Sequence, residues 1–144
     1  MIKWPQTQKL EPPCIVHWLV QINRNHVVVT TAGDCSKLDL GMESGSILDN
    51  WINASSELHA GTAANNGRLN YTAGSSWCAS TNDSNPYLQI DLQTLHIICA
   101  VSTQGNSQGD QWVKTYTLQS STDGTTWTDY KEGGQINKKV TILV

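Results

Sequence analysis

Few side chains in this 144-residue chain are spaced for catalysis. The chain contains no G-x-S-x-G, H-E-x-x-H, Walker or Rossmann glycine pattern. Asp49, Asp83 and Asp91 could supply an acid pair, but no spacing argues for one. Histidines, the commonest general bases, are isolated from one another at His17, His26, His59 and His96. These residues predict a protein that is not an enzyme.

The four cysteines favour disulfide bonds over a metal site. They form no C-x-x-C pair and do not combine with histidines at a zinc spacing. N-x-S/T acceptors for N-glycosylation begin at Asn53, Asn70 and Asn82, as in a secreted β-protein. Stretches rich in Asp and Asn could hold a structural Ca²⁺, although no EF-hand pattern is present. We therefore expect no cofactor and no metal beyond that structural calcium.

Composition and charge point to a β-domain outside the cell. Charged residues make up 15% of the chain, Phe is absent, and six Trp supply large apolar side chains. A net charge of −3 gives no reason to expect nucleic acid as a partner. Residues 1–34 contain only short, interrupted apolar runs, so no clear signal peptide is visible. An extracellular location, as a secreted protein or an ectodomain, is inferred from this chemistry.

The elements that would position a site are strands. Tyr87–Leu92 alternates apolar and polar residues, and Ile97–Val101 is a β-branched run typical of a buried strand. Ile47–Ala54, Trp112–Ser121 and Thr125–Tyr130 are predicted strands as well, and Asp123-Gly124 predicts a hairpin between the last two. The predicted fold class is therefore all-β.

Several separate blocks of this sequence resemble the discoidin domain, also called the coagulation factor V/VIII type C domain. They are CSKLDLGMESGSI, INASS, GRLNY, SSWC, YLQIDL, CAVSTQG and STDGTTWTDY, in this order from Cys35 to Tyr130. The resemblance implies an antiparallel jelly-roll β-sandwich, like that of galactose-binding domains, without a catalytic centre. It also implies ligand-binding loops at one end, here residues 57–66, 71–76 and 106–111.

The resemblance divides the chain into three parts. Residues 1–34 form an irregular extension, 35–135 a partial discoidin domain, and 136–144 a short tail without family character. Because no closing cysteine follows residue 134, we expect a C-terminally truncated domain in which Cys35 lacks its partner. Cys78 precedes the central strand and Cys99 lies on the next, so a Cys78–Cys99 disulfide is geometrically reasonable. The alternative is that Cys99 is a free, buried residue.

Charge and residue type on the loops limit the ligand classes. Between residues 35 and 113 two basic residues, Lys37 and Arg68, face seven acidic ones, which makes binding to an anionic phospholipid membrane unfavourable. The collagen-receptor branch of the family has Trp where Leu58 stands and Arg where Asn106 stands, so collagen binding loses its strongest contacts. Arg68 is expected to form a structural ion pair with Asp49 or Asp91.

The three predicted loops carry a rim of neutral polar side chains, which are suited to sugar hydroxyls or to a polar protein surface. We therefore expect an extracellular adhesion or matrix- and glycan-recognition module that is lectin-like, with a structural spacer domain as the alternative. Tryptophans 51, 77, 112 and 127 are expected in the core, with Trp77 the best candidate among them to line a pocket. The candidate ligand-binding residues are Leu58, His59, Thr62, Asn65, Asn66, Ser75, Ser76, Trp77, Asn106, Gln108 and Gln111.

Overall fold

The computed structural model of the chain describes two long stretches and several short ones. They are residues 40–94, 103–106, 108–109, 111–113, 116–132 and 135–136. The predicted extension 1–34, the strand 97–101, and the cysteines at 14, 35 and 99 lie outside the described residues. In the part described, the regular elements are short strands and 3₁₀ helices, which agrees with the all-β prediction.

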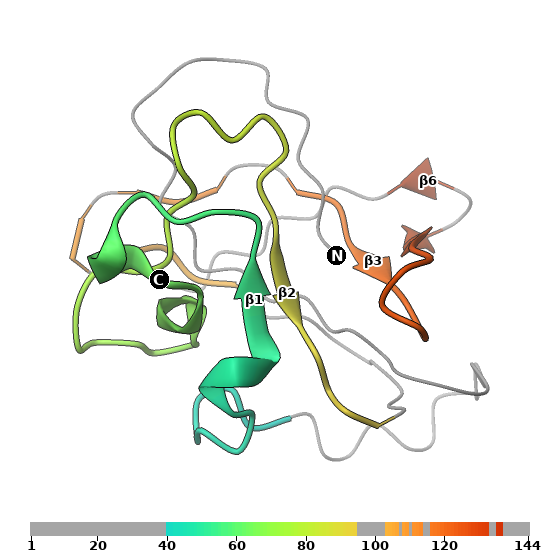
Figure 1. Cartoon of the computed structure of the whole chain (residues 1–144), viewed down its shortest axis with the longest axis horizontal. Coiled ribbons are helices and arrows are strands. Elements are labelled where there is room, and N and C mark those ends of the chain that lie inside the picture. Colours follow the sequence, from blue (N-terminus) through green and yellow to red (C-terminus); the bar gives the residue numbers. More distant parts are fainter. Residues whose placement is uncertain are drawn as a thin grey trace.

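The central pairing joins β1 (Ile52–Ala54) to β2 (Leu88–Ile90) in antiparallel register, with Ile52 opposite Ile90 and Ala54 opposite Leu88 (Figure 1). Backbone hydrogen bonds continue the pairing at each end, from Asp91 N–H to Trp51 O and from Ser55 N–H to Tyr87 O. Leu88 and Ile90 are buried while Gln89 between them is only half-buried. The strand predicted from alternation at 87–92 is confirmed in its central part, Leu88–Ile90.

The segment before β1 differs from the prediction. Residues 47–54 were expected to form one strand, but Asp49–Trp51 forms a 3₁₀ helix (η1) and only Ile52–Ala54 is a strand. The cause lies far away in the sequence, because the Arg68 guanidinium binds both the Ile47 carbonyl and the Asp49 carboxylate. That contact draws the backbone into a turn, which the Trp51 N–H to Leu48 O bond closes.

The core is formed around the β1–β2 pair by residues from distant parts of the chain. Trp77 and Leu88 are completely buried, and Ile52, Ile47 and Val113 are nearly so. Trp51 and Trp127 pack against this cluster from the side. Three of the four tryptophans expected in the core are therefore in it or against it.

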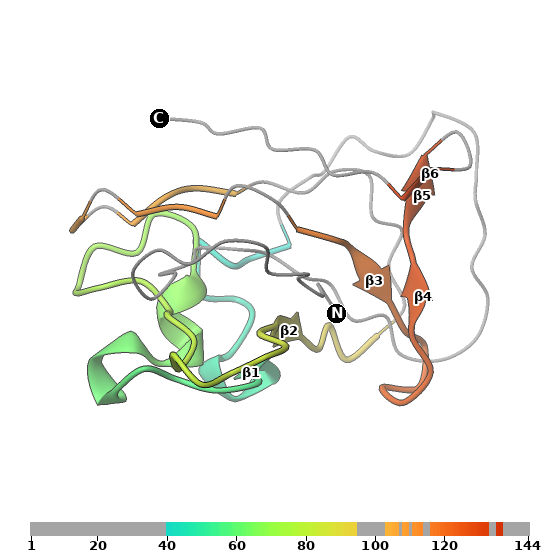
Figure 2. The same cartoon turned by 90° about the horizontal axis from the view of Figure 1, so that it is seen from above.

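The C-terminal part contains two further antiparallel pairs, on the right in Figures 1 and 2. β3 (Gln119–Ser120) pairs with β4 (Thr128–Asp129), and β5 (Lys131–Glu132) pairs with β6 (Gln135–Ile136). The predicted hairpin is confirmed with Asp123 and Gly124 in its turn, where Gly124 has a φ of 75°. Asp123 Oδ1 accepts the backbone N–H groups of Thr125 and Thr126, which lowers the pKa of its carboxyl.

Both β3 and β4 are shorter than the strands predicted over 112–121 and 125–130. Among the described residues no helix has the length and apolarity required to cross a membrane.

Candidate ligand-binding loops

The first loop, 57–66, is not irregular but folds into two 3₁₀ turns, η2 (Ala60–Thr62) and the start of η3 (Ala64–Gly67). His59 and Thr62 cap η2 reciprocally: His59 Nδ1 accepts Gly61 N–H, and Thr62 Oγ1 accepts His59 N–H. Glu57 Oε1 accepts Ala64 N–H at 2.9 Å and so fixes the start of η3. This loop is consequently held in one shape by its own side chains.

The second loop is tied to the first by a single amide. Asn66 Nδ2 donates to Gly61 O and to Ser75 O, each at 2.9 Å, and Asn66 is buried. Two backbone bonds to Cys78, just after the second loop, reinforce the contact: Leu58 N–H donates to Cys78 O at 2.8 Å, and Cys78 N–H donates to Thr62 O at 3.4 Å. Loops 57–66 and 71–76 therefore form one hydrogen-bonded body.

The third loop is closed by an amide pair at its base. Asn106 and Gln111 form an antiparallel bridge, with Asn106 N–H donating to Gln111 O and Asn106 Nδ2 to Gln111 Oε1 at 2.9 Å. Just before this loop, Gln104 Oε1 accepts the backbone N–H of Asn70 at 2.8 Å, beside the second loop. Figures 1 and 2 both show the described parts of all three loops on the left side of the molecule, away from β3–β6.

Burial divides the expected rim into two groups. Side chains that remain open to solvent, wholly or in part, are Leu58, His59, Asn65, Ser75, Gln108 and Gln111. Thr62, Asn66, Ser76 and Asn106 are buried, which corrects their expected place on the rim. Trp77, the fifth buried candidate, lies in the core, where the tryptophans were expected.

The buried residues act within the loops instead. Thr62 and Asn66 donate to backbone carbonyls of the loops, and the Asn106 amide donates to the Gln111 side chain. Trp77 is a core residue with 0% exposure, and its indole N–H donates to Ser56 O at 2.8 Å. Ser76 Oγ is buried without a hydrogen-bond partner in the part of the chain described.

Sequence reasoning missed one exposed aromatic side chain at this end. Trp112, expected in the core, is 43% exposed and directly follows Gln111 of the third loop. Neighbouring Val113 is buried, and successive side chains of an extended backbone point in opposite directions. That alternation was the available signal, because it allows only one of the two residues to face the core.

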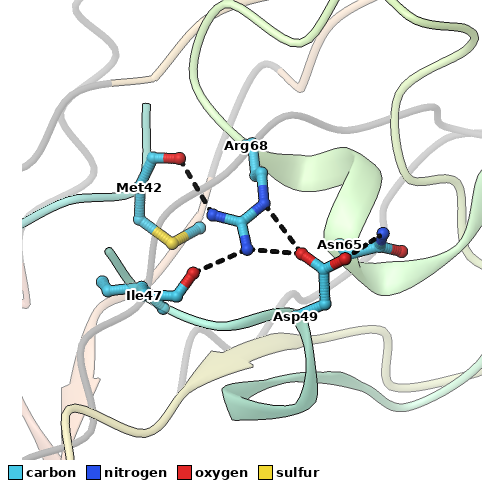
Figure 3. Close-up of polar contacts among 5 residues, drawn as sticks. All are labelled: Met42, Ile47, Asp49, Asn65 and Arg68. Carbon is cyan, nitrogen blue, oxygen red and sulfur yellow. Dashed lines mark hydrogen bonds and ion pairs between the residues drawn. The ribbon is translucent and has the colours of Figure 1, made fainter. Parts of the chain in front are cut away.

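The structural ion pair joins Arg68 to Asp49 rather than to Asp91 (Figure 3). Arg68 also donates to two backbone carbonyls, from Nη1 to Met42 O at 3.0 Å and from Nη2 to Ile47 O at 2.6 Å. Asn65 Nδ2 donates to the second carboxylate oxygen of Asp49 at 3.2 Å. The guanidinium is therefore a structural clamp between η1, η3 and the turn at residue 42, and its charge is paired with the Asp49 carboxylate.

Asp91 has a different role and accepts the N–H of Gln93 at 2.8 Å. With Arg68 engaged by Asp49, the loop end offers little positive charge. Arg68 is the only Lys or Arg among the described residues of the 40–113 range, where Glu43, Glu57 and Asp83 add negative charge. The electrostatics suit a neutral ligand better than an anionic one.

Asp83 fastens the 80–87 connection to the end of β1. Its Oδ2 accepts the hydroxyls of Ser55 and Ser56, each at 2.5 Å, and its Oδ1 accepts the N–H of Asn85 at 2.9 Å. Burial on its own would raise the pKa of this carboxyl, but the three hydrogen bonds outweigh it and lower the pKa below the ordinary 3.8. Ser55 Oγ and Ser56 Oγ in turn accept the N–H groups of Tyr87 and Ser80, so the ionised carboxylate organises the whole connection.

Because the folded pKa of Asp83 is depressed, its ionised form stabilises the fold above pH 3.8, and that contribution is lost as pH falls through the folded pKa. We expect a carboxyl ¹³C NMR titration of Asp83 to have its midpoint below 3.8, and Ser55→Ala and Ser56→Ala each to move the midpoint upward. Ser84→Ala, beside Asp83 but outside these bonds, is the control. A midpoint at or above 3.8 in the unsubstituted protein would contradict the assignment.

Asn53, Asn70 and Asn82 are all exposed, although Asn70 Nδ2 also donates to Glu43 at 2.7 Å. Cys78 is buried and disulfide-bonded. The other three cysteines lie outside the described residues, so the pairing with Cys99 stays a prediction, as does the use of the three glycosylation acceptors.

Across the described segments no three His, Cys, Asp or Glu side chains gather as a metal site would require. A structural calcium therefore stays a prediction without support from this part of the chain.

The chain is similar to a known domain family over most of its length. The family model of the F5/8 type C domain matches residues 51–143. Human neuropilin-1 is 36% identical over 100 residues, which is 67% of this chain and 11% of that protein. Human epithelial discoidin domain-containing receptor 1 is 37% identical over 100 residues (65% and 11%), and rat neuropilin-2 is 34% identical over 114 residues (73% and 12%). The match thus spans about a tenth of each relative.

Proposed function

Because this chain belongs to the F5/8 type C domain family, whose fold is a β-sandwich, we propose that it is an extracellular, non-catalytic binding module that holds its ligand on the loops at one end. One of its relatives is by name a receptor that contains a discoidin domain. The observation that carries the proposal is the hydrogen-bonded assembly of loops 57–66 and 71–76 beside the closed loop 106–111.

Loops that are already ordered before binding favour a high affinity for a ligand. Ordering a mobile loop on binding consumes part of the interaction free energy, whereas loops already held by Asn66, Thr62 and Asn106 avoid that loss. The hydrogen bonds of these buried polar groups specify one conformation of the loops, which covering the core alone would not require. A structural spacer domain would not need loops held in one conformation by side-chain hydrogen bonds.

The chemistry of the exposed groups favours a neutral polar ligand. His59, Ser75, Gln108 and Gln111 offer hydroxyl, amide and imidazole groups, which match sugar hydroxyls or a polar protein surface. Leu58 is half-buried and Asn106 is buried, so neither supplies the aromatic or cationic contact of the collagen-binding alternative. An anionic phospholipid surface would meet no free cation among the described residues of this end.

Binding assays with one loop variant test the proposal. We expect the protein to bind members of a glycan array but neither phosphatidylserine liposomes nor triple-helical collagen peptide. Gln108→Ala should weaken that binding about two- to tenfold, the range for one lost hydrogen bond. Thr125→Ala, an exposed polar truncation in the β3–β4 turn on the opposite side, should leave affinity unchanged. Absence of binding to every probe would favour the spacer.

A further inference from the structure

Asn70 is placed to carry a covalently attached glycan at the junction of the second and third loops. We propose that Asn70 is an N-glycan attachment site and that its glycan shields these two loops from protein-sized partners; the inference rests on the extracellular location in the proposed function. The acceptor triplet is Asn70-Tyr71-Thr72, and both Asn70 and Thr72 are exposed. Such a glycan would be a part of this chain and would be distinct from any ligand of the loops.

The backbone presents the Asn70 side chain on a tight turn. Tyr71 N–H donates to Arg68 O at 3.3 Å, and this bond closes a turn in which Asn70 is the third residue. Asn70 has a φ of 56°, a left-handed conformation that asparagine tolerates better than most residues do. Because the Arg68 guanidinium donates to Met42 O and Ile47 O, the start of the turn is fixed as well. The acceptor asparagine is therefore exposed on a turn that is held in one conformation.

Two hydrogen bonds place Asn70 beside segments that are distant in sequence. Its backbone N–H donates to Gln104 Oε1 at 2.8 Å, two residues before Asn106 and the third loop. Its Nδ2 donates to Glu43 Oε1 at 2.7 Å, and Glu43 is exposed. The second loop begins at the next residue of the chain, Tyr71. A bulky group on Asn70 Nδ2 would consequently stand where the second loop meets the segment that leads into the third.

Attachment of a glycan is compatible with these contacts. In the transfer, Asn70 Nδ2 forms a bond to the anomeric carbon of a lipid-linked oligosaccharyl pyrophosphate, the bond from that carbon to the pyrophosphate oxygen breaks, and Nδ2 loses one proton. The amide keeps its second N–H, which can still donate to Glu43. The bond from the backbone N–H to Gln104 is not affected. The folded turn can therefore hold the modified asparagine in the same place.

The other two acceptor triplets are placed differently. Asn53 lies in β1, and the hydroxyl of its triplet, Ser55 Oγ, donates to Asp83 at 2.5 Å. Asn82 is followed by that same Asp83, whose carboxylate fastens the connection to the end of β1. Only the triplet of Asn70 overlaps the second loop in sequence. A shield for the loop end is therefore expected from the glycan of Asn70 and not from the other two acceptors.

Expression of the full chain through the secretory pathway of cultured mammalian cells, followed by mass spectrometry of its peptides, tests the attachment. We expect the peptide that contains Asn70 to carry an oligosaccharide. Thr72→Ala should abolish the modification, whereas Thr72→Ser, which keeps an N-x-S acceptor, should retain it. Thr72 is exposed and forms no hydrogen bond with the other described residues, so neither substitution disturbs the contacts of Asn70. An unmodified Asn70 in the secreted protein would overturn the inference.

Chymotrypsin, a protein-sized probe that cleaves after aromatic residues, tests the shield on the same secreted proteins. Cleavage after Trp112, which is 43% exposed and follows the third loop, should be at least about threefold slower in the glycan-bearing protein than in Thr72→Ala. Cleavage after Tyr130, which is 53% exposed and follows β4 on the other side of the molecule, should be equally fast in both.

Ser84→Ala is the matched control, because it removes the acceptor at Asn82 and should leave cleavage after Trp112 as slow as in the unsubstituted protein. Equal rates after Trp112 with and without the Asn70 glycan, or no cleavage there in either protein, would overturn the shield. The same slowing after Tyr130 would also overturn it, since the glycan would then act on the whole chain. Neither measurement uses a ligand, so failure of the inference is distinguishable from failure of the module to bind any probe.

Discussion

Replacing Trp77 by alanine should lower the free energy of unfolding by about 3–5 kcal/mol, the usual cost of removing a fully buried aromatic side chain. Trp77 has no exposed surface and packs in the cluster that contains Leu88 and Ile90. The substitution would leave a cavity beside the β1–β2 pair and would also leave the Ser56 carbonyl without the indole N–H that it now accepts. Since domains of this size have about 5–15 kcal/mol of stability in total, the loss is a large share.

Urea denaturation followed by far-ultraviolet circular dichroism would measure this loss. Trp112→Ala is the matched control, because the same substitution at a 43% exposed tryptophan should cost at most about 1 kcal/mol. If Trp77→Ala does not fold, Trp77→Phe remains informative: it keeps most of the packing and loses the N–H, so an intermediate cost of about 1–3 kcal/mol is expected. Similar costs for the two alanine variants would mean that Trp77 is not a core residue.

Replacing Arg68 by methionine should cost about 2–4 kcal/mol, most of it from the two backbone carbonyls and not from the ion pair. The Arg68 side chain is only 14% exposed, and the Met42 and Ile47 carbonyls belong to buried residues. Asp49, by contrast, is 65% exposed, so its carboxylate returns to water with little penalty. Asp49→Asn should therefore cost no more than about 1 kcal/mol.

The comparison of the two single variants separates these contributions. Equilibrium denaturation of Arg68→Met and Asp49→Asn should give clearly unequal losses, and Arg68→Lys should recover only part of the difference because an ammonium lacks the planar fork of donors. Raising the salt concentration should hardly affect the loss in Arg68→Met, since hydrogen bonds to buried carbonyls are not screened. Equal losses in the arginine and aspartate variants would show that the salt bridge, and not the clamp, carries the stability.

The parts of the fold predicted correctly are those set by local sequence. Alternation alone placed β2 near Leu88–Ile90, and the Asp123-Gly124 turn marked the β3–β4 hairpin. The 47–51 segment could not be read in this way, because its coiled shape depends on Arg68, which is distant in sequence. A contact with a residue distant in sequence does not change the apolar–polar periodicity of the segment, so the periodicity cannot predict its effect.

The candidate site was predictable in location but not in detail. Resemblance to the discoidin family indicated the three loops, and Figures 1 and 2 show the described parts of these loops on one side of the molecule. Polarity could not distinguish Asn66, whose amide is spent on two carbonyls inside the loops, from Gln108, whose side chain is exposed. Apolar character likewise could not distinguish Trp77 from Trp112, because each follows a polar residue and precedes an apolar one.

The single amide of Asn66 has a consequence for protein engineering. Because it bonds to Gly61 O and Ser75 O at once, the two backbones share one anchor. If only one of the two segments is replaced by the corresponding segment of a related domain, the hydrogen bonds of Asn66 are not matched. Both loops would then change their conformation. Chimeras that aim to change the partner of this module must therefore exchange residues 57–66 and 71–76 as one cassette.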